Sequence, residues 1–113
     1  DAVATAFKNS DYDIEVIRAE SPRDTVELCQ IYEPFVLVME VTGYAPWKLG
    51  ERLRLRDEVK ALCPNCKIAL MVDSNTERQT AKDIRDAKKD GLIDQFFYGS
   101  MSAEYLMDQI YAM

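Results

Sequence analysis

The sequence contains no histidine. Ser-His and Cys-His catalytic pairs, phosphohistidine relays and most zinc and haem sites depend on imidazole, so these classes of site are excluded for this chain. Cysteine is scarce and odd in number, with three residues, and no apolar run approaches the roughly 18 residues of a membrane-spanning helix. We therefore expect a cytoplasmic protein with reduced thiols, no bound metal and no cofactor.

Basic side chains are also few. The chain has 14 Lys and Arg residues against 20 Asp and Glu residues, and its net charge is −6. Nucleic acids and anionic membranes attract positively charged surfaces, so neither is an expected partner. Glycine and proline number four each among 113 residues, and 48% of the residues are hydrophobic. This composition is typical of one globular domain, here residues 1–113, with a core of its own.

Apolar strand patterns alternate with helical patterns along the chain. The predicted strands are 14–18, 35–41, 67–72 and 93–98. The predicted helices are the helix that ends at about residue 9, then 21–33, 48–62, 76–90 and a last helix after residue 100. Strict alternation of this kind indicates an α/β domain, with a parallel sheet and helices on both of its faces.

Some helix boundaries carry signals of their own. Ser21 followed by Pro22 suits an N-cap and a first helical position. Thr76 is the expected N-cap of the helix at 76–90, and Gly91 is expected to end that helix in the left-handed conformation.

Polar or small residues follow the three apolar runs at their carboxyl ends. Glu40 lies at the end of the first run, Asp73 and Ser74 follow the second, and Tyr98 and Gly99 follow the third. Functional groups of parallel α/β sheets lie at the carboxyl ends of the strands. These five residues therefore define the candidate functional site.

The run Leu37-Val38-Met39-Glu40-Val41 resembles the third strand of receiver domains in bacterial response regulators, where a phosphorylated Asp holds the position of Glu40. Pro46 and Gly50 have the mutual spacing of the Pro and Gly that follow this strand in receivers, displaced by about two residues. The resemblance covers nearly the whole chain. It implies a flavodoxin-like, doubly wound fold with strand order 2-1-3-4-5, and a first strand that would lie upstream of Asp1 together with the acidic pair of the family.

In that order the first strand is central. Without it, two neighbouring strands have unpaired edges, which is an aggregation hazard. We therefore expect the folded molecule to include upstream residues or to recruit a strand from a neighbouring molecule.

The residues that carry phosphotransfer in receivers are replaced here. Glu40 is one methylene longer than Asp, Asp73 and Ser74 follow a strand that usually ends in a hydroxyl residue, and Tyr98 and Gly99 fall where the family has Lys-Pro. Phosphotransfer depends on positioning and on positive charge, so a displaced carboxylate, an added negative charge and a missing lysine all oppose it. The sequence thus predicts a signal-transduction module that is not an enzyme and acts by binding a protein partner or by homodimerisation.

Three other interpretations remain open. The first is a working phosphoacceptor receiver whose acidic pair lies upstream. The second is that Glu40 imitates a phosphorylated Asp or shares a cation with Asp73, against the simpler view that it marks an abandoned site. The third is a thiol-redox protein using Cys63 and Cys66, although this pair follows a helix and precedes a strand, the reverse of the thioredoxin-type context.

Aromatic residues supply the candidate binding surfaces. Tyr44 and Trp47 lie in the loop after Glu40, where they either anchor a partner or cover the end of the sheet. Tyr105 and Tyr111 lie on the last helix, near the surface through which receivers commonly dimerise.

Overall fold

The computed structural model describes residues 15–73, 76–99 and 102–113. The helix predicted to end at about residue 9 lies outside these ranges, as does Ser74. The elements are α2 (Pro22–Tyr32), β1 (Val36–Val41), α3 (Leu49–Leu62), β2 (Lys67–Val72), α4 (Arg78–Lys89), β3 (Gln95–Tyr98) and α5 (Ala103–Tyr111). From α2 onward, helices and strands alternate as predicted.

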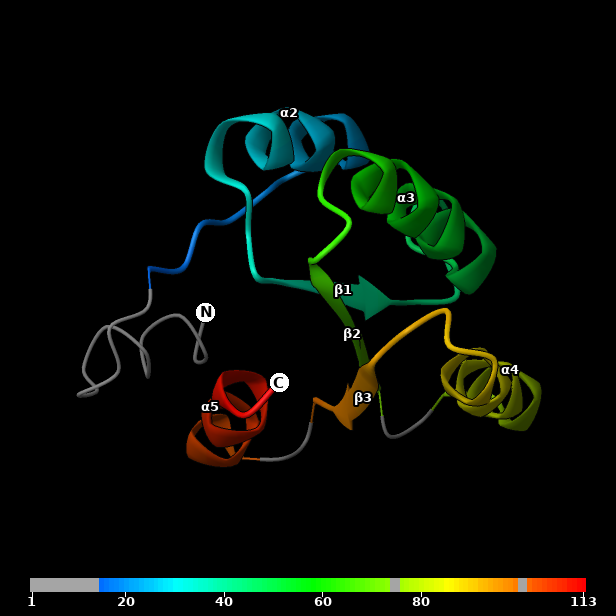
Figure 1. The fold of residues 1–113 in the computed structure, drawn as a ribbon. Coiled ribbons are helices and arrows are strands. Elements are labelled where there is room, and N and C mark those ends of the chain that lie inside the picture. Colours follow the sequence, from blue (N-terminus) through cyan, green and yellow to red (C-terminus); the bar gives the residue numbers. More distant parts are fainter. Residues whose placement is uncertain (1–14, 74–75, 100–101) are drawn as a thin grey trace.

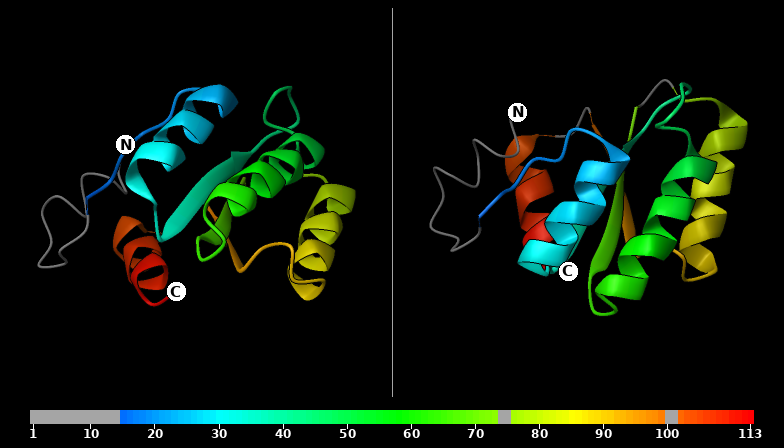
Figure 2. Two further views of the ribbon diagram at one scale, coloured as in Figure 1. Left: turned by 45° about the horizontal axis from the view of Figure 1, so that its top comes forward. Right: turned by 90° about the horizontal axis from the view of Figure 1, so that it is seen from above.

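The strands form one parallel sheet with the order β1-β2-β3. In Figure 1, α5 lies on the opposite side of the strands from α3 and α4. The two further views in Figure 2 show α2 beside α3. The chain is therefore an α/β protein with helices on both faces of a parallel sheet, an architecture compatible with a flavodoxin-like fold.

The central strand β2 is buried on both faces. Ile68, Ala69 and Leu70 each have 0% of their surface exposed. Successive side chains of a strand point to opposite faces, so Ile68 and Leu70 pack with α2, α3 and α4, whereas Ala69 packs with Phe97 and α5. This explains why residues 68–72 include no polar side chain: after the exposed Lys67, helices cover both faces of β2.

Two of the three boundary signals act as predicted. The Ser21 hydroxyl accepts a hydrogen bond from the backbone N–H of Asp24 at 3.0 Å, with Pro22 in the first position of α2. Gly91 has a φ of 79°, a left-handed conformation that costs glycine little. The third signal is wrong by one residue: Glu77 is the N-cap of α4, because Thr76 belongs to the turn after β2 and donates its N–H to the Asp73 carbonyl at 3.0 Å.

The strand predicted at 14–18 is not observed within its described part, residues 15–18. Val16 and Ile17 are 44% and 40% exposed. A strand is stable only when a neighbour satisfies its backbone groups, and the sheet of the described residues ends at β1. An alternating sequence pattern alone does not supply that neighbour.

The last strand starts two residues later than predicted, at Gln95. Before β3 begins, the Asp94 side chain accepts a hydrogen bond that a strand carbonyl would otherwise accept from β2. Its Oδ2 accepts the N–H of Ile68 at 2.7 Å, while its N–H donates to the Ile68 carbonyl at 2.8 Å. The entry of β3 is thus joined to β2 by a carboxylate.

Candidate functional site

Glu40 is the penultimate residue of β1, not its last. Val41 still pairs with Val72 of β2, while Glu40 pairs with Met71. Because Met39 and Val41 are buried among the side chains of α2, α3 and α4, strand alternation directs Glu40 toward the opposite face, the one that carries α5. Its side chain is exposed. The strand ends at Val41, as predicted, so Glu40 lies next to the carboxyl end of β1.

A guanidinium group lies beside this part of the strand. The Nε of Arg52, in the first turns of α3, donates a hydrogen bond to the Glu40 carbonyl at 2.8 Å. The guanidinium carbon lies 4.5 Å from the centre of the Trp47 ring. Burial lowers the pKa of Arg52, and the carboxylates of Glu40 and Glu51 act in the opposite direction. The cation is held against a carbonyl and an aromatic face.

Arg52 is not among the site residues predicted from the sequence. The receiver resemblance implies a lysine after β3, whereas the positive charge comes from the helix after β1. The available signal was the position of Arg52 early in that helix, which follows β1 directly and so starts at the carboxyl edge of the sheet.

The loop between β1 and α3 is closed by its own hydrogen bonds. The N–H of Thr42 donates to the Trp47 carbonyl at 2.9 Å, and the N–H of Trp47 donates to the Tyr44 carbonyl at 2.8 Å. The Thr42 hydroxyl lies 3.1 Å from both the N–H and the carbonyl of Tyr44. A seven-residue loop with these contacts holds a defined shape.

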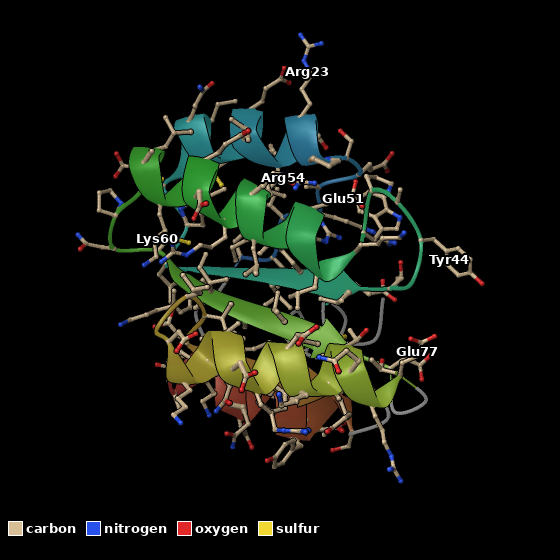
Figure 3. The ribbon with its side chains drawn as sticks, turned by 90° about the vertical axis from the view of Figure 1, so that its right-hand side faces the viewer. Arg23, Tyr44, Glu51, Arg54, Lys60 and Glu77 are labelled. Atoms are coloured by element: carbon tan, nitrogen blue, oxygen red, sulfur yellow. The ribbon has the colours of Figure 1, made fainter. Side chains whose placement is uncertain are left out.

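The two aromatic residues of this loop have different environments. Trp47 is half-buried, and the Arg52 guanidinium lies over its ring. Tyr44 is 80% exposed and projects from the loop into solvent in Figure 3. The two side chains therefore differ in accessibility: Trp47 is partly shielded beside Arg52, and Tyr44 is open to solvent.

Asp73, Tyr98 and Gly99 lie together at the ends of β2 and β3. Tyr98 pairs with Val72, and the N–H of Gly99 donates to the Val72 carbonyl at 2.8 Å, so the ladder continues beyond β3. The Tyr98 ring meets Phe96 edge to face, with ring centres 6.2 Å apart. Asp73 is exposed, and its carbonyl closes the turn with Thr76.

These side chains do not form a metal centre. In the ranges 15–73, 76–99 and 102–113, no group of three or more His, Cys, Asp or Glu side chains is arranged to hold a metal ion. The suggestion that Glu40 and Asp73 share a cation gains no support from this arrangement.

The three thiols gather at the other end of the sheet. Cys29 of α2, Cys63 after α3 and Cys66 before β2 are all buried. The Cys63 Sγ donates to the Cys29 carbonyl at 3.5 Å. Burial, followed by the neighbouring thiols Cys29 and Cys63, raises the pKa of Cys66 to about 11, and burial with Cys63 raises the pKa of Cys29. The sequence did not predict that Cys29 joins the pair.

Tyr105 and Tyr111 of α5 are 45% and 51% exposed. Their spacing places them roughly 120° apart around the helix axis. They therefore do not form one continuous stripe on α5.

Within the part of the chain that the structure describes, no helix combines the length and the apolar character needed to cross a membrane. A scan against protein-family models finds no match for this chain, and a search among curated proteins finds none either.

Proposed function

We propose that this chain is a receiver-like regulatory domain that binds a protein partner, or a second copy of itself, without aspartyl phosphorylation. In this proposal β1, β2 and β3 correspond to the third, fourth and fifth strands of the 2-1-3-4-5 order. Their observed order, β1-β2-β3, agrees with that assignment.

The proposal rests on the groups found at the carboxyl edge of the sheet, where β1, β2 and β3 end. A phosphoryl group needs an acceptor at the strand tip, a free cation and a hydroxyl donor. Glu40 lies one residue before the end of β1. The strand β3 ends at Tyr98 and Gly99 follows it, with no lysine at either position. The positive charge of Arg52 is held by the Glu40 carbonyl and Trp47. The groups that neutralise a transferred phosphoryl group in receivers are thus absent or already engaged here, as far as the described residues extend.

The same edge suits presentation of a side chain to a partner. Tyr44 stands on a loop closed by four hydrogen bonds through Thr42 and Trp47. An aromatic anchor on an ordered loop loses little conformational freedom on binding. A thiol-redox function is not favoured, because a thiol whose pKa is raised by burial supplies little thiolate at neutral pH.

Incubation with acetyl phosphate and Mg²⁺, followed by intact-mass measurement, tests the proposal. We expect no mass increase by a phosphoryl group, and no change in the NMR spectrum on addition of beryllofluoride with Mg²⁺. Sedimentation velocity is expected to give the same distribution with and without acetyl phosphate. A stable adduct on Glu40 would overturn the proposal and support a working phosphoacceptor receiver.

A further inference from the structure

Basic side chains form a straight row along the outer side of α4. Because successive helical residues are about 100° apart around the helix axis, four of the basic residues of α4 fall within about 60° of one another. They are Arg78, Lys82, Arg85 and Lys89, and all four are exposed. The buried residues Ile84 and Ala87 lie on nearly the opposite side of the helix. This row, the α4 stripe, is about 16 Å long.

The cations of the α4 stripe are not engaged by the chain itself. Across residues 15–73, 76–99 and 102–113, none of the four forms an ion pair or a side-chain hydrogen bond. Lys88, the remaining basic residue of α4, differs from them. Its Nζ donates to Oε1 of Gln95 at 2.9 Å and lies 5.7 Å from the centre of the Phe96 ring. The stripe therefore presents its positive charge to solvent.

The stripe itself is unfavourable for the helix. Arg78 and Lys82, and likewise Arg85 and Lys89, are like charges four residues apart, which destabilises a helix. Arg78 also lies in the first turn, where the helix dipole disfavours a positive charge. Asp86 has the spacing to pair with Lys82 or Lys89, but it forms an ion pair with neither. Helix stability thus does not explain the stripe, whereas binding of an anionic partner does.

The surroundings of the stripe limit the kind of anion that fits it. Asp83, Asp86 and Asp90 form an acidic row about 100° around the helix from the stripe. A broad anionic surface, such as a nucleic acid or a membrane, would approach both rows and would be repelled by the acidic one. The net charge of −6 adds to that repulsion. A single row of carboxylates on a peptide segment contacts the basic stripe alone.

We infer that the α4 stripe binds an acidic segment of a protein partner, whose carboxylates match the spacing of the four cations. Arg78 and Arg85 each present a planar guanidinium that binds a carboxylate through two parallel hydrogen bonds, which fixes the orientation of the segment. Lys82 and Lys89 contribute charge between and beyond them. The inference deepens the proposed function and rests on it, because it names the chemistry of the partner.

NMR titration of the ¹⁵N-labelled chain tests the inference. The probe is a capped, alanine-based peptide with four glutamates at the spacing of the α4 cations. We expect saturable shifts confined to the backbone amides of α4 and its immediate neighbours. The same peptide with glutamine in place of each glutamate is expected to bind at least about tenfold more weakly, because each exposed ion pair contributes a modest share of the affinity.

The double variant Lys82→Gln/Arg85→Gln removes the two central cations of the stripe. Glutamine is a good helix former, and the change relieves like-charge repulsion, so α4 is expected to stay folded. Binding of the glutamate peptide is expected to weaken by about tenfold. Arg23→Gln/Arg54→Gln is the matched control: it removes the same charge from exposed residues of α2 and α3, apart from α4 (Figure 3), and is expected to leave binding nearly unchanged.

Equal weakening in the two double variants would show general attraction to any basic side chain and would overturn the inference. Shifts of α4 that a short DNA duplex produces as strongly as the peptide would overturn it in favour of a nucleic-acid surface. The absence of any saturable shift on α4 would overturn it as well. Each of these results leaves the acetyl phosphate experiment unaffected, so failure of the stripe and failure of the proposed function are distinguishable.

Discussion

Replacing Arg52 with methionine removes the guanidinium and keeps most of the aliphatic stem. The change deletes the 2.8 Å hydrogen bond to the Glu40 carbonyl and the stacking on Trp47 at 4.5 Å. A hydrogen bond from a charged donor contributes about 1.5 to 3 kcal/mol, and a partly exposed cation–π contact contributes about 0.5 to 1 kcal/mol. Arg52 is only half-buried, so we take the lower ends and expect a loss of about 2 kcal/mol in the free energy of unfolding.

Urea denaturation followed by circular dichroism measures this loss. With a slope of about 1 to 2 kcal/mol per molar urea, the midpoint falls by about 1 to 2 M while the slope stays unchanged. Arg54→Met is the matched control, because Arg54 lies on the same helix, carries the same charge and is exposed. We expect this control to stay within about 0.5 kcal/mol of the wild type.

A double-mutant cycle with Trp47→Leu isolates the stacking contribution. We expect a coupling energy of about 0.5 to 1 kcal/mol between positions 47 and 52. Equal free energies of unfolding for Arg52→Met and Arg54→Met would refute the view that Arg52 holds the carboxyl edge together.

Further predictions concern a thiol, a helix cap and a strand edge. The pKa of Cys66 is about 11 in the folded chain against 9.0 for an ordinary thiol, so the unfolded chain loses this proton at lower pH. The free energy of unfolding therefore falls as pH rises from about 9 to about 11. Cys66→Ala is expected to remove that part of the pH dependence. Ser21→Ala loses the cap on Asp24 and is expected to cost about 1 kcal/mol in urea denaturation, whereas Thr80→Ala, within α4, serves as a control outside any cap. Val38 is 37% exposed on β1, at the edge of the described sheet. Because a lysine on an edge strand disfavours pairing with another strand, Val38→Lys is expected to reduce concentration-dependent self-association in sedimentation equilibrium. Unchanged association would contradict a role for this edge.

Local signals in the sequence predicted the strands and helices well where neighbouring elements reinforce them. The apolar run at β2 predicted a strand buried on both faces, and Ile68, Ala69 and Leu70 confirm it. Ser21 predicted the start of α2 because a cap is a contact between residues three apart in the chain. Contacts between residues close together in the chain can be predicted from a short segment of sequence.

Contacts between elements far apart in the sequence were not predicted, and the reason is physical. The bond from Arg52 to Glu40 joins residues twelve apart, and the approach of Cys29 to Cys63 joins residues thirty-four apart. Both depend on how α2 and α3 are rotated and seated on the sheet, which packing decides and periodicity does not. The pattern at Val16 and Ile17 failed similarly, because strand formation depends on a partner that the alternating pattern does not specify.

The arrangement at the carboxyl edge links stability to presentation of Tyr44. The loop after β1 is closed at its base, where the N–H of Thr42 donates to the Trp47 carbonyl and the Arg52 guanidinium lies over the Trp47 ring. Loss of the guanidinium frees that ring, and the loop then gains conformations that a partner must suppress on binding. Arg52→Met is therefore expected to weaken any contact made through Tyr44 even though it leaves Tyr44 in place.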